Sequence, residues 1–166
     1  MPVNKPELAR DTDAREILAL YRAATEAAKR TGHSHWDDDY PSEETIRADL
    51  RGGYLYVWRE DGKIVAAITY MHPDDLDGIG VSWTPVERAV EACRFCLSPT
   101  LQGKGRAKAF FLGGIELLRE QGVQAMRYLC AKDNVAAYRI YTGVGHRQLE
   151  DTVQHGVDFY SFEALL

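Results

Sequence analysis

Two β-rich segments flank an Asp61-Gly62 pair in the middle of the chain, and they constrain the fold more than any other feature. Residues 54–60 (YLYVWRE) and 63–72 (KIVAAITYMH) are rich in β-branched and aromatic side chains, as strands are. Asp-Gly is a preferred pair in two-residue turns between antiparallel strands. A third strand is expected at residues 87–97 (ERAVEACRFCL), beyond a polar, glycine-bearing stretch. The centre of the chain therefore predicts a meander of three strands.

Helix-spaced apolar patterns lie on both sides of this meander. The first runs from a cap at Thr12 or Asp13 to about Thr31, and a second, shorter helix starts at Ser42. The sequence after the meander predicts, in order, a helix over 105–121, a strand over 124–130, a short helix over 134–143 and two strands between 146 and 165. This order predicts a mixed α+β sheet flanked by helices, in a single domain over residues 1–166.

Charge and composition exclude several classes of protein. The formal net charge of −5 argues against a nucleic-acid binder, which would carry an excess of basic groups. The longest apolar runs, 54–58 and 64–68, are far shorter than the roughly 20 residues that span a bilayer. The start of the chain has no apolar signal region, so we expect a cytoplasmic protein that binds no membrane. Three cysteines fit a reducing compartment, and Cys93 and Cys96 are expected to be small buried side chains.

A glycine-bearing turn, SPTLQGKGRAKAF, joins the third strand to the following helix. The N-terminus of a helix exposes backbone N–H groups and attracts anions. Gly103 and Gly105 leave room for a bulky anion, while Lys104, Arg106 and Lys108 add positive charge. The spacing fits neither the nucleotide triphosphate loop nor the dinucleotide fingerprint. The turn therefore indicates a phosphate or diphosphate site, with an ordinary loop-to-helix junction as the alternative.

Two sequence blocks resemble the GNAT superfamily of N-acetyltransferases. The turn matches Q/R-x-x-G-x-G/A, the acyl-CoA pyrophosphate loop of that family, over residues 102–107. A second block resembles N-x-x-A-x-x-L-Y-x-x-x-G-F, through Asn134, Ala137, Ile140, Tyr141 and Gly145. This block departs from the pattern at Ile140 and, more clearly, at His146, where the family has an aromatic residue. The resemblance covers about residues 42–166, and the first helix with its loop fits the family's variable acceptor region.

The resemblance implies a fold and a co-substrate. The implied fold is a mostly antiparallel sheet of six or seven strands, splayed between strands four and five and flanked by about four helices. Acetyl-CoA would lie in that gap as the co-substrate, held in part by backbone groups at the end of the fourth strand. The implied cofactor-binding residues are Phe95, Cys96, Leu97, Gln102, Gly103, Lys104, Gly105, Arg106, Ala107, Asn134, Ala137 and Tyr141. For Asn134, the alternative role is to cap the helix that follows.

The implied reaction requires a base for the amine and a hydrogen-bond donor for the departing thiolate. An amine of pKa about 10.4 must lose a proton at a cost of about 4.6 kcal/mol at pH 7. Glu91, eight residues before Pro99, is the first candidate base, and Glu87 is the second. Tyr141 matches the family's acid and would stabilise the departing thiolate through a hydrogen bond. The alternative for Glu91 and Glu87 is a solvated carboxylate without a catalytic role, and the alternative for Tyr141 is an aromatic ring packed in the core. No cysteine is placed for an acyl-enzyme route, so direct attack in a ternary complex is expected.

The loop over residues 33–40 (HSHWDDDY) falls where the family helps to form its acceptor site. Acidic and aromatic side chains suit a cationic amine, so Trp36, Tyr40 and Glu87 are predicted to bind the acceptor. His33 and His35 with the carboxylates could instead ligate a metal, or the loop is simply solvated; we expect no metal. The expected partner is a small-molecule or peptide amine, bound by a monomer or homodimer. A non-catalytic acyl-CoA-binding module is the alternative function.

Overall fold

The computed structural model describes residues 4–31 and 36–166, and it divides them into two compact units. Unit 1 contains Met1–Tyr70 and Arg94–Leu117, and unit 2 contains Met71–Cys93 and Leu118–Leu166. The chain therefore passes between the units three times, once within the strand β4 (Ala89–Leu97) and once within the helix α3 (Arg106–Glu120).

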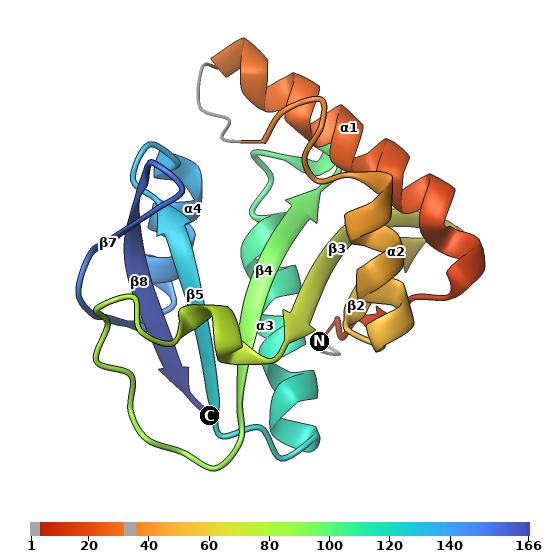
Figure 1. Cartoon of the computed structure of the whole chain (residues 1–166). Coiled ribbons are helices and arrows are strands. Elements are labelled where there is room, and N and C mark those ends of the chain that lie inside the picture. The colour runs from red at the N-terminus through yellow and green to blue at the C-terminus, as the bar shows by residue number, and fades with distance from the viewer. Residues whose placement is uncertain (1–3, 32–35) are drawn as a thin grey trace. The chain divides into compact units, whose positions relative to one another are not determined.

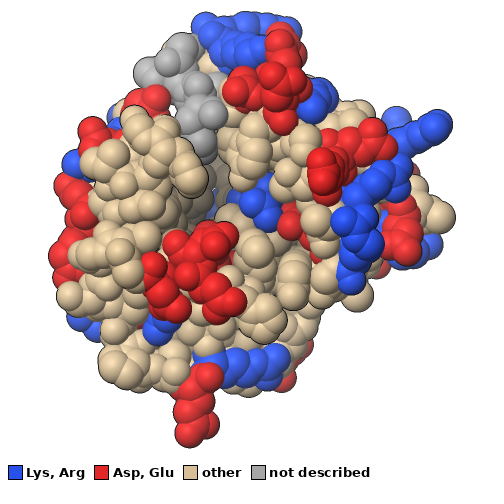
Figure 2. Space-filling model, in the orientation of Figure 1, with Lys and Arg blue, Asp and Glu red and all other residues tan. Residues whose placement is uncertain are grey.

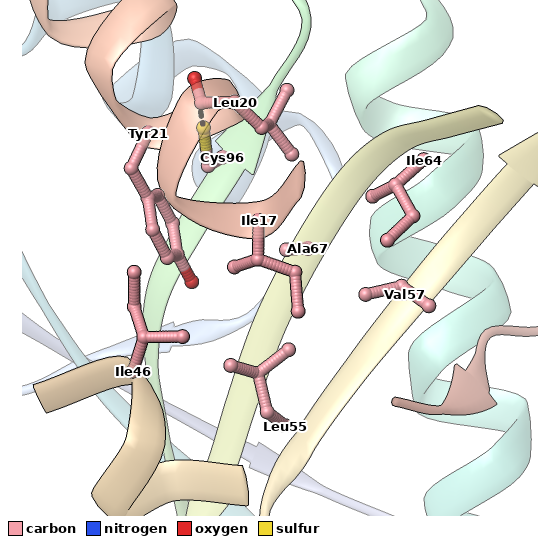
Figure 3. Packing of buried hydrophobic residues seen from close by; sticks show 9 residues of the cluster. All are labelled: Ile17, Leu20, Tyr21, Ile46, Leu55, Val57, Ile64, Ala67 and Cys96. Atoms are coloured by element: carbon pink, nitrogen blue, oxygen red, sulfur yellow. Dashed lines mark hydrogen bonds between the residues drawn. The ribbon is translucent and has the colours of Figure 1, made fainter. Parts of the chain in front are cut away.

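Unit 1 has a small sheet with helices on both faces (Figure 1). Its strands are β1 (Glu7–Leu8), β2 (Leu55–Glu60), β3 (Lys63–Met71, of which Met71 lies in unit 2) and the end of β4. The helices α1 (Ala14–Thr31) and α2 (Glu43–Gly52) cover one face. Figure 3 shows side chains from both helices meeting β2, β3 and β4 in a cluster of buried residues, namely Ile17, Leu20, Tyr21, Ile46, Leu55, Val57, Ile64, Ala67 and Cys96.

The opposite face of the unit 1 sheet carries aromatic side chains. Trp58 lies 5.3 Å from Phe110 of α3, and Phe95 lies 5.7 Å from Phe111, measured between ring centroids. Val57 and Trp58 point to opposite faces because side chains alternate along a strand. Gly114 of α3 allows a close approach to β3, because a Cβ on this residue would lie 1.9 Å from Tyr70 Oη.

Local sequence signals set the boundaries of these elements. The Ser42 hydroxyl accepts a hydrogen bond from the Thr45 N–H (3.1 Å) at the start of α2. Gly53, with φ of 71°, ends the same helix. The predicted hairpin is confirmed, since β2 and β3 are antiparallel and both Asp61 and Gly62 have positive φ.

Unit 2 is organised around a long C-terminal strand, β8 (Val157–Leu165). This strand pairs antiparallel with β5 (Ala125–Ala131), β6 (Arg147–Gln148) and β7 (Thr152–Gln154). The start of β4 pairs with β5 in parallel. Unit 2 also contains the helix α4 (Val135–Gly143) and the single turn η2 (Pro73–Leu76), and unit 1 contains the single turns η1 (Asp11–Asp13) and η3 (Pro99–Leu101).

The strand order is β1-β2-β3-β4-β5-β8-β6, with β7 added on β8. The predicted mixed α+β fold is confirmed, and two of the eight strands are only two residues long. Within the part of the chain that the structure describes, no helix is both long and apolar enough to span a membrane.

Candidate active site

The glycine turn of unit 1 has positive φ at both of its glycines. Gly103 and Gly105 have φ of 76° and 71°, values that side chains disfavour, and α3 begins at Arg106 directly after them. A Cβ on either glycine would meet no other atom within 4 Å. The backbone conformation of the turn therefore favours glycine at both positions, and the space next to each glycine is open.

The basic side chains of this turn differ in their surroundings. Arg106 donates to Glu60 Oε1, and its guanidinium lies 5.1 Å from the centre of the Phe110 ring. Lys104 and Lys108 are exposed, as is Gln102. The exposed positive charge at the start of α3 thus comes from the two lysines, because a carboxylate of the protein already pairs with Arg106.

The predicted cofactor-binding end of β4 has its side chains packed in unit 1. Cys96 and Leu97 are buried, and the Cys96 Sγ lies 3.8 Å from the Leu20 carbonyl oxygen (Figure 3). Burial raises the pKa of the Cys96 thiol, which therefore stays protonated. Phe95 is half-buried between the rings of Trp58 and Phe111. The side chains of Cys96 and Leu97 are therefore unavailable to a ligand, and the prediction that this segment binds through its backbone stays a prediction.

The predicted acceptor loop begins inside the described residues at Trp36, while His33, Ser34 and His35 lie outside them. The Trp36 ring packs edge-on against Tyr21 of α1, with 5.4 Å between the centroids. The Tyr40 hydroxyl accepts a hydrogen bond from Arg94 Nη1 (3.1 Å), and Tyr40 is 41% exposed. Tyr40 therefore presents a ring to solvent while β4 fixes its hydroxyl.

Asp37 organises the backbone of this loop. Its carboxylate accepts from the N–H groups of Asp39 and Tyr40, each at 2.8 Å, and its own N–H donates to the Tyr40 carbonyl. The Asp38 carboxylate pairs with Lys29 at 2.6 Å. These two carboxylates have structural partners, which leaves a smaller part of the loop's negative charge for a ligand.

Unit 2 contains both candidate bases. Glu91 is half-buried, and its Oε2 atom is shielded from solvent. It stands opposite Arg127 at the last position of the parallel register between β4 and β5, although both strands continue further. Glu87 is exposed and precedes β4. The burial of a carboxylate oxygen makes Glu91 the better candidate.

The helix α4 carries the other predicted residues of unit 2. Asn134 Oδ1 accepts from the N–H of Ala137 at 3.1 Å, so the helix-capping role is present. The Asn134 amide nitrogen carries two N–H donors that could serve a ligand. Tyr141 is buried, 4.6 Å from Tyr128 and 5.6 Å from Phe162 between ring centroids.

The electrostatics around Tyr141 keep its hydroxyl protonated. Burial, and then the neighbouring Cys130, raise the pKa of Tyr141. Burial also raises the pKa of the Cys130 thiol, to about 12, with a further contribution from Asp133. Tyr141 can therefore donate a hydrogen bond throughout the physiological pH range, but transfer of its proton is costly.

An acidic surface lies on unit 2 around η2. Asp74 and Asp75 of this turn are exposed, and Figure 2 shows acidic side chains gathered over it. Such a surface attracts cations. Among residues 4–31 and 36–166, no group of three or more histidine, cysteine, aspartate or glutamate side chains is arranged to hold a metal ion.

The structure adds residues that the sequence reasoning missed. Asp49 and Arg94 form a buried ion pair in unit 1, and Arg127 forms another with Glu163 in unit 2. Thr84, in the segment that precedes β4, donates to Glu163. The signal was available, because a single charged residue inside an apolar stretch, such as Arg127 in QAMRYLC, indicates a buried partner.

Known proteins resemble this chain in sequence and in structure. The profile of the Acetyltransferase (GNAT) family matches residues 16–146. A curated protein named mycothiol acetyltransferase, from Amycolatopsis mediterranei, is 30% identical over 123 residues, which cover 68% of this chain and 38% of that protein. Its namesake from Renibacterium salmoninarum is 30% identical over 110 residues, 61% of this chain and 31% of that protein. The chain thus spans about a third of the length of these relatives.

The solved structures share the fold at lower sequence identity. A GNAT acetyltransferase from Streptococcus agalactiae superposes with a TM-score of 0.84 at 23% identity, covering 98% of this chain and 95% of that one. The yncA protein of Salmonella typhimurium, determined with acetyl-CoA, gives a TM-score of 0.69 at 20% identity, covering 98% and 93% of the two chains.

Proposed function

Since the chain belongs to the GNAT acetyltransferase family, we propose that it transfers an acetyl group from acetyl-CoA to a primary amine by direct attack in a ternary complex. The glycine turn before α3 carries this proposal. Gly103 and Gly105, both with positive φ, stand directly before a helix of 15 residues, and the space next to each glycine is open. That arrangement suits the diphosphate of coenzyme A.

Each unit supplies part of the proposed binding residues. In unit 1, the turn over 102–107 would bind the diphosphate, and the backbone of 95–97 would bind the pantetheine arm. In unit 2, Asn134, through its amide nitrogen, and Ala137 are the proposed cofactor-binding residues. These assignments rest on the match to the family pattern and on the positions of these residues at the ends of β4 and α4.

The proposed chemistry has one proton acceptor and one hydrogen-bond donor. Glu91 takes the proton of the acceptor ammonium, directly or through water, which makes the amine nucleophilic. The amine nitrogen then bonds to the carbonyl carbon of the thioester and gives up its second proton to water. The carbon–sulfur bond breaks, and the thiolate leaves and is protonated from solvent. Tyr141 donates a hydrogen bond to the developing thiolate; its raised pKa disfavours full proton transfer at that point.

The proposed acceptor is a cationic amine, which suits both aromatic rings and acidic side chains. Trp36 and Tyr40 offer aromatic rings in unit 1, and Asp74 and Asp75 provide an acidic surface in unit 2. Glu87, which is exposed and precedes β4 in the chain, is a further proposed acceptor contact. Because two curated relatives are named mycothiol acetyltransferase, the unacetylated form of mycothiol belongs among the amines to be tested.

Two measurements test the proposal. Calorimetry should detect saturable binding of coenzyme A, and a screen of amines should detect release of free thiol above a hydrolysis control. Binding of coenzyme A without turnover on any amine would favour a non-catalytic acyl-CoA-binding module. No binding of coenzyme A or acetyl-CoA at millimolar concentration would refute the proposal altogether.

A further inference from the structure

A row of alternating charges crosses the sheet of unit 2 and ends at the candidate base. Glu91 on β4 is in register with Arg127 on β5, and Arg127 is in register with Glu163 on β8. Glu163 is in turn in register with Arg147 on β6. Residues opposite each other in adjacent strands point to the same face, and the strands lie about 4.8 Å apart. The four side chains therefore share one face, with their signs alternating.

The centre of this row is a buried and well-bonded carboxylate. Glu163 has no exposed surface. The Thr84 N–H donates to its Oε2 at 2.9 Å, and the Thr84 hydroxyl donates to its Oε1 at 2.5 Å. Arg127 Nε lies 3.3 Å from the same Oε2. Burial of a carboxylate is costly unless it is paired and hydrogen-bonded, and Glu163 meets both conditions.

Arg127 is held on more than one side. Its Nη2 donates to the Thr84 carbonyl at 2.7 Å, and its guanidinium lies 5.6 Å from the centre of the Trp83 ring. The guanidinium is thus fixed by a strand and by the segment that precedes β4. Arg127 is only 8% exposed, so solvent screens its charge less than it screens the charge of a surface arginine.

We infer that Arg127, fixed by Glu163 and Thr84, is a positioning residue that keeps the carboxylate of Glu91 ionised and so sets the pH above which the base acts. The inference rests on the proposed function, in which Glu91 accepts the proton. A cation one strand away favours the charged form of a carboxylate, and the anion of Glu163, two strands away, opposes it more weakly. Arg147 stands one strand further out, and Glu87 lies on the approach to β4 itself.

Two single variants distinguish this role from a purely structural one, because the acidic limb of the kcat/KM profile should shift in opposite directions in the two. Arg127→Met removes the near cation and leaves Glu163, so the acidic limb of the kcat/KM profile should move up by about one pH unit. Glu163→Gln keeps an oxygen that can accept from Thr84 but leaves Arg127 uncompensated, so the limb should move down by about half a unit. A packing defect would lower activity without moving the limb in opposite directions.

Two further variants control for charge and folding. Arg127→Lys retains the charge and should keep the acidic limb near its position in the unmodified protein. The double variant Arg127→Met with Glu163→Gln leaves no uncompensated buried charge, which favours folding, and its limb should lie between those of Arg127→Met and the unmodified protein. Circular dichroism and calorimetry with coenzyme A check that each variant is folded and binds.

A direct titration provides a readout that does not depend on turnover. Carboxyl carbon NMR follows the titration of Glu91 in the unmodified protein and in each variant, with Glu91→Gln used to assign the signal. Relative to the unmodified protein, the titration midpoint of Glu91 should move up in Arg127→Met and down in Glu163→Gln. If folded variants leave that midpoint and the acidic limb unmoved, Arg127 has no such role. If the unmodified protein acetylates no amine, the proposed function fails, while the midpoints still decide whether Arg127 acts on Glu91.

Discussion

Arg94 of β4 and Asp49 of α2 form a two-point ion pair, with Nη2 2.8 Å from Oδ1 and Nε 2.9 Å from Oδ2. Both side chains are largely buried, and Asp49 also accepts from the Thr69 hydroxyl at 2.8 Å. Arg94 has φ of 52° in the middle of a strand, a conformation that is rare for a non-glycine residue. The pair joins a helix to an irregular point of β4, from which Arg94 also reaches Tyr40.

The first prediction concerns the stability that this pair contributes. Asp49→Ala should lower the free energy of unfolding by about 3 kcal/mol, because it leaves a buried guanidinium without its carboxylate. Denaturation in urea measures the change. Glu43→Gln, at the exposed pair with Arg47 on the same helix, is the matched control and should change stability by less than about 0.5 kcal/mol. Similar losses in both variants would contradict a special role for the buried pair.

The second prediction concerns the backbone of the glycine turn. Gly103→Ala adds a methyl group that meets no other atom within 4 Å, so its cost is the positive φ, about 1–2 kcal/mol. Affinity for coenzyme A should fall by about tenfold as the turn relaxes, as calorimetry can measure. Gly143→Ala in α4 is equally unobstructed but has no positive φ, so it should leave affinity unchanged. Equal affinities in both variants would argue against the turn as the diphosphate site.

The third prediction concerns Tyr141. Tyr141→Phe should lower kcat by about 100-fold and leave KM for acetyl-CoA nearly unchanged, because the lost hydrogen bond forms mainly in the transition state. Tyr138→Phe is the control on the same helix; its hydroxyl donates to Gln148 at 3.1 Å, and kcat should stay close to that of the unmodified protein. An undiminished kcat in Tyr141→Phe would remove this residue from the mechanism.

The fourth prediction concerns His146, whose Nδ1 lies 2.5 Å from the Tyr128 hydroxyl. Burial, and then the charge of Arg119, lower the pKa of His146 in the folded protein. As the pH falls, this histidine is protonated first in the unfolded chain, near pH 6.5. The contribution of neutral His146 to the free energy of unfolding is therefore complete above that value. This contribution is lost as the pH falls through the lower, folded pKa.

His146→Phe should therefore weaken the dependence of stability on pH. The free energy of unfolding, measured in urea at about pH 7.5 and about pH 5, should differ less in this variant than in the unmodified protein. His155→Asn is the control, at an exposed residue with φ of 52° that asparagine tolerates. An unchanged difference in His146→Phe would show that another group titrates.

The sequence predicted the elements well because their signals are local. The Asp61-Gly62 turn, the Ser42 cap and the start of α3 after Gly105 depend on residues within a few positions of each other. The two blocks that resemble the GNAT family are also short, and the resemblance implied the fold. Local structure of this kind can be predicted from a short stretch of sequence.

The charged pairs could not be predicted because they join residues far apart in the chain. Arg127 and Glu163 are 36 positions apart, and Arg94 and Asp49 are 45 apart. Which charges meet depends on strand register, and a shift of one residue would send every side chain to the opposite face. The side-chain partner of Arg106 was missed for the same reason, since Glu60 belongs to a different element.

Neither compact unit is a continuous segment of the chain, and this affects how the protein can be made. The first 70 residues leave the ribosome before Phe110 and Phe111, whose rings complete the aromatic face of unit 1. Residues 71–93 likewise emerge long before β8, which bears their partner Glu163. A nascent chain thus holds unfinished surfaces of both units at once, and any single truncation that keeps one whole unit also keeps a segment of the other.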